Sequence, residues 1–366
     1  MVLVSCSSDK NDEKIIVPKL EETSKDIFYK GMDLSFQPEL ENFNVRYNDE
    51  NNNQLSLLPF VKQKGTNLIR LKLWCNPANG LNGLESVKNY ALRIKQNNMS
   101  FLLDIHYSDT WADPSNQSPP IAWQSLTIAD LKLQVYNYTK QVLTELKNQG
   151  TIPDFVQIGN ETDSGFLWNF GKVWNSFNNN WQNYADLFNK GSQAVREVCG
   201  ANTKIIFHHS SVENSIYFLQ QLNNFPIDYD VIGLSYYPQY QTKDLNLVQS
   251  KLNTLATTFN KKIMIVEVAY PFTLSYNDGL NNLLGNANQI IANYDASPQG
   301  QKDFMLKIVS IIKNIPNNQG IGFVYWAPDW VSFAGNATTT TGGSSWENQC
   351  LWNFDHKALM AFDVFK

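Results

Sequence analysis

Eight short apolar runs alternate with longer amphipathic segments along this chain. We expect strands at residues 28–34, 67–73, 100–105, 154–159, 204–208, 230–235, 262–267 and 321–326. Each run is nearly continuous in apolar residues, as is typical of strands buried on both faces. Helical spacing is expected at 53–64, 84–97, 127–148, 180–199, 212–223, 244–259 and 300–314. Eight strands alternating with helices predict a parallel sheet of the α/β class, and the count favours a closed (β/α)8 TIM barrel.

The chain length of 366 residues fits one such barrel with long loops after its strands. We therefore expect residues 27–366 to form a single catalytic domain. The clearest helix follows Thr127, a plausible N-cap with Asp130 three residues later, and ends near Gly150. No glycine-rich phosphate loop follows the first strand, which excludes a dinucleotide-binding domain.

The N-terminus resembles the end of a bacterial lipoprotein signal. The piece LVSC is followed at once by Ser, Ser, Asp and Lys, and such signals are acylated on the cysteine, here Cys6. We expect residues 1–26 to be a truncated signal and a flexible tether, because this charged stretch has little capacity to form a core. The alternative is an ordinary tail cysteine. Lipidation would make the protein an exported outer-membrane or cell-surface lipoprotein.

Composition limits the possible partners. The net charge of −5 argues against a nucleic-acid partner, and no apolar run is long enough to span a bilayer, so membrane contact is expected only through the lipid. We expect a monomer. Cys75, Cys199 and Cys350 allow at most one disulfide, and no C-x-x-C pair indicates zinc.

Polar and aromatic side chains cluster just after the predicted strands. They are Asp33, Trp74, His106, Asp109, Asn160, Glu161, His208, His209, Tyr236, Tyr237, Glu267 and Trp326. In a barrel the carboxyl ends of all strands face the same end, where active sites lie. Several tryptophans, among them Trp111 in the loop after the third strand, stand beside polar residues, and their rings suit the apolar faces of sugars.

Two glutamates end predicted strands four and seven. Glu161 stands in QIGNETD and Glu267 in IMIVEVAYP, on strands that lie across a barrel from each other. Retaining glycosidases need two carboxyl groups about 5–5.5 Å apart, one as nucleophile and one as acid and then base. Asn160 offers an amide for the sugar 2-hydroxyl. Each glutamate alone has a structural alternative, and Asn160-Glu161-Thr162 is also formally a glycosylation sequon.

From about Gly31 to the C-terminus the chain resembles glycoside hydrolase family 53, the arabinogalactan endo-β-1,4-galactanases of the large retaining barrel clan. The motifs that carry the resemblance are GMDLS, IRLKLW, LLDIHYSDTWADP, QIGNET, DVIGLSYYP, VEVAYP and YWAPDW, in the order of the strands. The resemblance implies retaining endo-hydrolysis of β-1,4-galactan, with Glu161 as acid/base and Glu267 as nucleophile.

The resemblance also implies roles for the surrounding residues. Arg70 would keep the nucleophile ionised and Tyr236 would bond near it, while His106 and Asn160 would line the subsite of the reacting sugar. Trp326 would be the stacking platform of that sugar. The strand-five histidine is matched by His208 rather than His209. The full set of expected substrate-binding residues is Asp33, Arg70, Trp74, His106, Asp109, Trp111, Asn160, His208, Tyr236 and Trp326.

Three departures from the family pattern concern this site. Val268 replaces a small hydroxyl residue, Asp329 differs beside the strand-eight tryptophan, and YYPQYQTKD lacks the usual Trp-His. Some members of the family bind calcium after strand seven, but the loop here has no clean ligand spacing. We expect no metal and no cofactor.

Two other functions stay open at this point. A mannanase or xylanase would use the same two glutamates with different loop contacts. A catalytically silent, surface glycan-binding lipoprotein could retain the barrel, although a binding module has no need of two opposed carboxylates.

Overall fold

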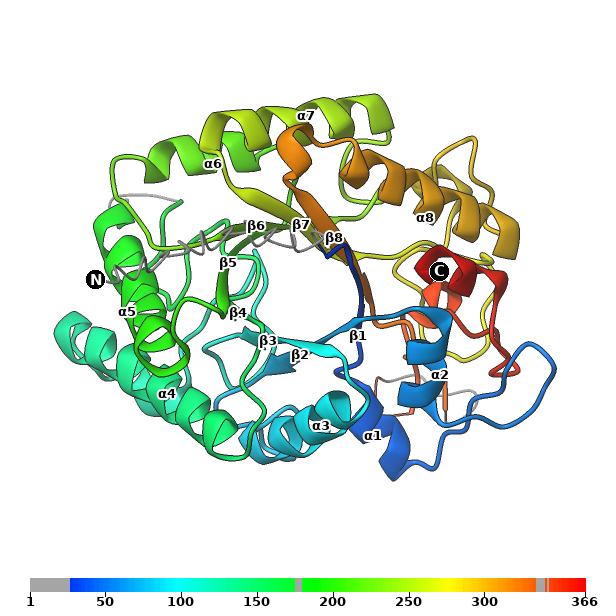
Figure 1. Ribbon diagram of the computed structural model, residues 1–366, viewed down its shortest axis with the longest axis horizontal. Coiled ribbons are helices and arrows are strands. Elements are labelled where there is room, and N and C mark those ends of the chain that lie inside the picture. Colours follow the sequence, from blue (N-terminus) through cyan, green and yellow to red (C-terminus); the bar gives the residue numbers. More distant parts are fainter. Residues whose placement is uncertain (1–26, 175–179, 334–339, 341) are drawn as a thin grey trace, which may run out of the picture.

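The computed structural model describes residues 27–174, 180–333, 340 and 342–366. Its centre is a closed barrel of eight parallel strands, each paired with its neighbours in sequence and β8 paired with β1 (Figure 1). The predicted (β/α)8 barrel is confirmed. The strands are β1 (Tyr29–Asp33), β2 (Leu68–Leu73), β3 (Ser100–Ile105), β4 (Phe155–Ile158), β5 (Lys204–His209), β6 (Val231–Tyr236), β7 (Lys262–Val268) and β8 (Gly320–Trp326).

Helices surround the strands on the outside of the barrel (Figure 1). The α-helices are α1 (Gln37–Asn42), α2 (Leu57–Lys64), α3 (Leu84–Gln96), α4 (Ile128–Asn148), α5 (Trp181–Cys199), α6 (Ser215–Leu222), α7 (Leu245–Phe259) and α8 (Pro298–Lys313). The 3-10 helices are η1 (Ile121–Trp123), η2 (Ala287–Gln289), η3 (Pro316–Asn318), η4 (Glu347–Gln349) and η5 (Met360–Phe365). All seven predicted helices are present within a few residues of their expected bounds, whereas α1 and the 3-10 helices were not predicted.

The barrel interior is filled by alternate residues of its strands. A lower layer of apolar side chains comprises Leu68, Leu102, Phe155, Ile206, Val231, Met264, Val266 and Val324. Two residues further along β2 and β3, the inward positions are Arg70 and Asp104, both buried. The interior therefore changes from apolar to charged towards the carboxyl ends of the strands, where barrel active sites lie.

An irregularity in β7 breaks this alternation. The pairing of β7 with β6 shifts between Leu234 and Ser235, so that Ser235 lies opposite Glu267 rather than Val266. The pairing of β7 with β8 also shifts between Ile265 and Val268. An extra residue at a bulge lets two consecutive side chains face the same side, so Val266 packs in the lower layer while Glu267 also points inward.

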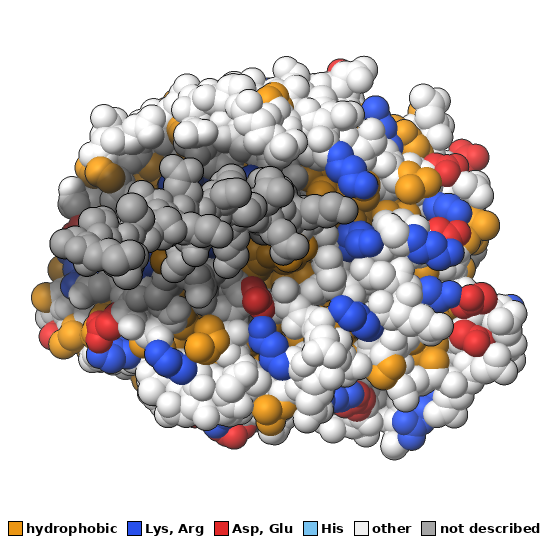
Figure 2. Space-filling view, viewed as in Figure 1, with side chains coloured by type: hydrophobic (Ala, Val, Ile, Leu, Met, Phe, Trp, Pro, Cys, Tyr) orange, Lys and Arg blue, Asp and Glu red, His pale blue; other side chains and the backbone are white. Residues whose placement is uncertain are grey.

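Contacts at the surface complete the fold. The C-terminal η5 packs against α8 and α2, between them on the outside of the barrel (Figure 1). On the face drawn in Figure 2, Lys and Arg side chains are interspersed with Asp and Glu among uncharged surface.

Cys75, Cys199 and Cys350 are free thiols. No helix within the described ranges is long and apolar enough to cross a membrane, and Cys6 lies outside those ranges.

Candidate active site

A cleft of about 820 Å³ opens at the carboxyl ends of the strands. Residues from the loops after β3, β4, β5, β6, β7 and β8 line it together with side chains of the barrel interior. Both predicted catalytic residues, Glu161 and Glu267, are among them.

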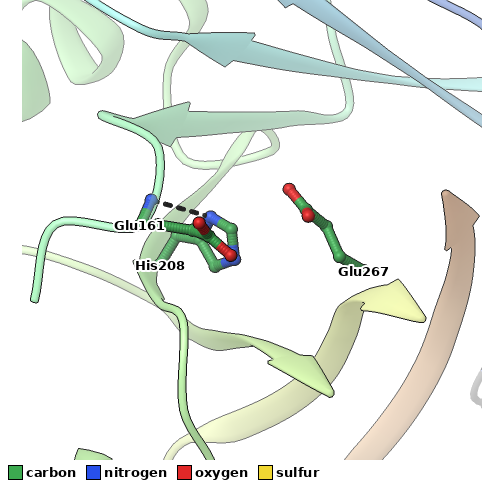
Figure 3. A group of neighbouring side chains, drawn as sticks. All are labelled: Glu161, His208 and Glu267. Carbon is green, nitrogen blue, oxygen red and sulfur yellow. Dashed lines mark hydrogen bonds between the residues drawn. The ribbon is translucent and has the colours of Figure 1, made fainter. Parts of the chain in front are cut away.

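Glu161 and Glu267 face each other across this cleft (Figure 3). One carboxylate oxygen of each, and one ring nitrogen of His208, all lie within 4.8 Å of one another. Carboxyl groups about 5–5.5 Å apart are the arrangement of retaining glycosidases, whereas inverting enzymes need about 6.5–9.5 Å to admit a water molecule. The pair therefore has the spacing that a covalent glycosyl intermediate requires.

Glu267 is held by a cation and a phenol. Arg70 Nη2 lies 2.8 Å from Glu267 Oε1, and the Tyr237 hydroxyl donates to Oε2 at 3.0 Å. Burial raises the pKa of Glu267 to about 7, while Arg70 and the Tyr237 hydroxyl act in the opposite direction. These contacts stabilise the ionised carboxylate, which faces the cleft and can act there as a nucleophile.

Arg70 is the centre of a buried polar network. Its guanidinium is 1% exposed and donates to Asp33 at 2.7 Å, to Asp104 at 2.9 Å and to Asn160 Oδ1 at 2.9 Å. A buried guanidinium costs much free energy unless it is paired, and here the carboxylates supply the pairing. Because Asp33 and Asp104 fix the guanidinium from below, it presents a fixed edge to Glu267.

Glu161 has a different environment. Its backbone adopts φ +45°, a left-handed conformation that costs free energy for a residue other than glycine. Its carboxylate Oε1 accepts from the Ser235 hydroxyl at 2.6 Å, and no ion pair to it occurs among the described side chains. Burial raises the pKa of Glu161 well above its usual value, and the neighbouring Glu267 and Asp163 raise it further. Of the two carboxyl groups, Glu161 is the one that keeps a proton.

His208 supports Glu161 from the side of β5. Its Nδ1 accepts the backbone N–H of Glu161 at 3.1 Å, drawn as a dashed line in Figure 3, and its Nε2 lies 3.0 Å from Ser235 Oγ. Burial and the nearby Arg70 lower the pKa of His208 well below its usual value, so the ring is neutral and its proton is on Nε2. His208 then donates to Ser235, which donates to Glu161.

The loop after β3 is fixed by two predicted site residues. His106 Nδ1 accepts the backbone N–H of Ala112 at 3.1 Å, and its Nε2 lies 3.0 Å from Asp104. Asn160 Nδ2 donates to the carbonyl of Ala112 at 2.8 Å. Both side chains line the cleft, and together they hold Trp111 at its wall.

Tryptophans form one end of the cleft. Trp326 at the end of β8 lies with Trp111, Trp330 and Trp346 around it, at centroid distances of 6.1, 6.3 and 4.7 Å. All four line the cleft. Aromatic faces of this kind stack on the C–H faces of sugars.

The comparisons with known proteins agree with this geometry. The profile of Glycosyl hydrolase family 53 matches residues 29–365. The chain belongs to that family. It is 37% identical to an arabinogalactan endo-beta-1,4-galactanase of Cellvibrio japonicus over 93% of this chain and 90% of that protein. It is 31% identical to an endo-beta-1,4-galactanase of Bacillus subtilis over 98% and 90% of the two chains.

Solved structures show the same relation. The family 53 catalytic domain of Ignisphaera aggregans superposes with a TM-score of 0.87 at 33% identity, covering 94% of this chain and 97% of that one. A fungal β-1,4-galactanase gives a TM-score of 0.80 at 28% identity, covering 92% and 98%. This family 53 chain is accordingly a glycoside hydrolase.

One sequence-based assignment within the family 53 site is wrong. Tyr236 does not contact the nucleophile. Its hydroxyl donates to the carbonyl of Thr242 at 2.8 Å, and its ring stacks near Phe304 of α8. Successive side chains of a strand point to opposite faces, so Ser235 and Tyr237 face the cleft and Tyr236 faces the helices. Tyr237 is the tyrosine at Glu267.

Four other expected binding residues, Asp33, Trp74, Asp109 and His208, lie behind the cleft rather than in its lining, and His208 acts there as the support of Glu161 described above. Asp109 Oδ2 accepts the backbone N–H of Ile121 at 2.9 Å, so it shapes its own loop instead. Trp74 packs edge-on against Trp111 and supports it from behind, with ring centroids 5.4 Å apart. Asp33 lies beneath the cleft, paired with the guanidinium described above.

The doublet His208-His209 is separated by the alternation of β5. His208 faces the interior, whereas His209 Nδ1 lies 3.6 Å from Asp163 and its ring packs on Phe218 of α6. Asp163 also accepts from the backbone N–H of Ser210 at 2.8 Å.

Several residues of the site were not predicted from the sequence. They are Lys72, Asp104, Gln157, Asp163, Ser235 and Tyr237 as a contact of the nucleophile. A pattern in the sequence indicates some of them. Arg70 and Lys72 alternate along β2 up to Trp74, which follows the strand, and Asp104 on β3 alternates with His106, which follows that strand. Polar residues at every second position of a buried strand indicate a polar interior layer.

Glu161, His208 and Glu267 are the one group with metal-ligand spacing that the described ranges contain. Both ring nitrogens of His208 are engaged with protein groups, and Arg70 already places a cation at Glu267. This donor set is arranged for proton transfer and does not fit a resident metal ion.

Proposed function

We propose that this chain hydrolyses internal β-1,4-galactosidic bonds of (arabino)galactan, with retention of anomeric configuration. The observation that carries the proposal is the opposed pair Glu161 and Glu267, within 4.8 Å but in unlike environments. The galactan substrate is supported by the names of the relatives in Cellvibrio japonicus and Bacillus subtilis. A cleft open to the surface suits attack within a polymer.

In the first step, Glu267 attacks the anomeric carbon of the reacting sugar while Glu161 gives its proton to the departing glycosidic oxygen. Because Ser235 donates to Oε1 of Glu161, the acidic proton is on Oε2, the oxygen free to meet that glycosidic oxygen. A covalent glycosyl–enzyme ester forms and the leaving sugar departs as an alcohol.

In the second step, the ionised Glu161 takes a proton from a water molecule. The water oxygen attacks the anomeric carbon and displaces Glu267, which returns to its contacts with Arg70 and Tyr237. Two inversions restore the original configuration. His208 and Ser235 keep Glu161 oriented through both steps.

The substrate-binding roles follow from placement in the cleft. His106 and Asn160 would meet the reacting sugar, Trp326 would be its platform, and Trp111 would form the adjoining wall. These assignments need no cofactor, and a monomer suffices because every group named comes from one chain.

Release of reducing ends from β-1,4-galactan, mannan and xylan tests the function. We expect release from galactan, and a loss of roughly a thousandfold or more in Glu267→Gln, because the nucleophile is removed. Glu85→Gln on the exposed surface of α3 is the matched control and should keep full activity.

Release from mannan or xylan instead would retain the mechanism and contradict the substrate. Silence on all three glycans would favour a binding lipoprotein. Substantial activity in Glu267→Gln would exclude that residue as the nucleophile.

We also infer export and anchoring through Cys6, on the strength of the LVSC-Ser-Ser motif. Incorporation of labelled fatty acid that is lost in Cys6→Ser would support this inference, and labelling of both proteins alike would contradict it.

A further inference from the structure

Lys72 is a buried lysine at the cleft that the proposed mechanism does not use. It lines the cleft, yet it is only 3% exposed. It lies two residues beyond Arg70 on β2, so both side chains face the interior. A strand rises about 3.3 Å per residue, which places Lys72 one layer nearer the mouth of the barrel than Arg70.

Aromatic rings hold the ammonium of Lys72. Its Nζ lies 3.7 Å from the ring centroid of Trp111, 3.9 Å from that of Phe36 and 5.2 Å from that of Trp74. The ring of Trp330 stacks on the ring of Phe36, with centroids 4.0 Å apart. This distance leaves no room for the ammonium between the two rings, so Lys72 lies on the other face of Phe36. Ring faces stabilise a cation while accepting no conventional hydrogen bond from it.

The two nearest rings leave one side of the ammonium uncovered. The centroids of Phe36 and Trp111 are 6.0 Å apart, less than the combined distances from Nζ to each. The ammonium therefore lies off the line that joins the two centroids. Since Lys72 also lines the cleft, an N–H donor is available to a ligand there.

The surrounding charges leave this donor available. Asp33 is committed to Arg70 at 2.7 Å, and the ion pairs formed within the described ranges include none with Lys72. Burial lowers the pKa of Lys72 to about 7, while Asp33, Glu39 and Asp329 favour the charged form and Arg70 disfavours it. Within the described ranges no side chain or carbonyl accepts from this ammonium, and an acceptor from a ligand would supply that hydrogen bond.

The position of Lys72 indicates which part of a glycan it meets. Glu161 and its partner Ser235 belong to the β4–β6 side of the cleft, so the leaving sugar departs there. Lys72 lies on the opposite side, between the loops that carry Phe36 and Trp111. It is also one layer above Arg70, which contacts the nucleophile, so it lies beyond the reacting sugar.

We propose that Lys72 is a substrate-binding residue whose ammonium donates a hydrogen bond to a hydroxyl of the sugar that precedes the reacting sugar on its non-reducing side. This inference rests on the proposed function, because it assumes a glycan extended in that direction. Lys72 would thereby set how many sugars must precede the cleaved bond.

The test is a cleavage map of a β-1,4-galactohexaose labelled at its reducing end. Lys72→Met keeps the length of the side chain and removes the donor, Lys72→Arg keeps a charged donor, and Lys204→Met, exposed at the start of β5, is the matched control. We expect Lys72→Met to lower kcat/KM on the hexaose roughly tenfold or more, the effect of a lost charged hydrogen bond. Cuts that leave the subsite at Lys72 empty should become relatively more frequent in Lys72→Met. In Lys72→Arg the cleavage pattern should return part of the way to that of the wild type.

The fraction of each cut does not depend on how much protein is folded, so it separates binding from stability. An unchanged pattern in a folded Lys72→Met would overturn the inference alone. A uniform fall of all cuts would also overturn it, because Lys72 would then be structural. Failure of the wild-type chain to cleave the hexaose would contradict the proposed function and, with it, this assignment.

Discussion

At the residue scale, Tyr236 and Tyr237 are identical side chains with opposite surroundings. Tyr237 donates to Glu267 at 3.0 Å, whereas Tyr236 donates to a backbone carbonyl at 2.8 Å behind the barrel wall. We expect Tyr237→Phe to lower kcat/KM roughly tenfold or more, because a hydrogen bond to a charged group is worth about 1.5–3 kcal/mol. Steady-state kinetics on galactan measure this change.

Tyr236→Phe is the built-in control for that prediction. It should leave kcat/KM unchanged and lower the free energy of unfolding by about 1 kcal/mol, the contribution of one ordinary hydrogen bond. Equal kinetic losses in the two variants would show that neither tyrosine acts through Glu267.

At the scale of elements, the N-cap of α4 is the clearest agreement between sequence and structure. The hydroxyl of Thr127 accepts the backbone N–H of Asp130 at 3.2 Å, as predicted from the sequence, and α4 begins at the next residue. The cap satisfies one of the N–H groups that a helix start leaves unpaired.

We expect Thr127→Ala to lower the free energy of unfolding by about 1 kcal/mol without changing kcat/KM, because α4 lies outside the barrel. Chemical denaturation and kinetics on galactan check the two parts. Thr127→Ser, which keeps the hydroxyl, should restore stability, and an equal loss in both variants would exclude the cap as the cause.

At the scale of the whole molecule, ionisation of the buried Glu161 in the active site lowers the free energy of unfolding. Burial raises the pKa of Glu161 well above its usual 4.5, so ionising this carboxyl costs free energy in the folded state. The cost is absent below pH 4.5, the ordinary value, and grows as the pH rises towards the folded-state pKa.

Glu161→Gln keeps the shape of the protonated acid and removes its titration. We expect it to match the wild type in free energy of unfolding near pH 4 and to exceed it increasingly towards pH 8. Denaturant titrations across this range measure the difference, with the exposed Glu85→Gln as the control that shows no such trend. A difference that stays constant with pH would contradict a raised pKa at Glu161.

Local patterns in the sequence determined the architecture and the chemistry of this protein. Continuous apolar runs and helical segments with period 3.6 depend only on near neighbours, so the eight strands, their order and the ends that carry Glu161 and Glu267 could be read from the chain. Family motifs then led to a glycoside hydrolase of family 53.

Only the tertiary structure decided which neighbours each of these residues has. The bulge in β7 turns Glu267 inward beside Val266 and so brings Tyr237 to it, a shift that depends on pairing with two other strands. The aromatic cage of Lys72 joins side chains from three separate loops and strands. Such contacts arise from barrel closure, which brings together residues far apart in the sequence, and no local periodicity encodes them.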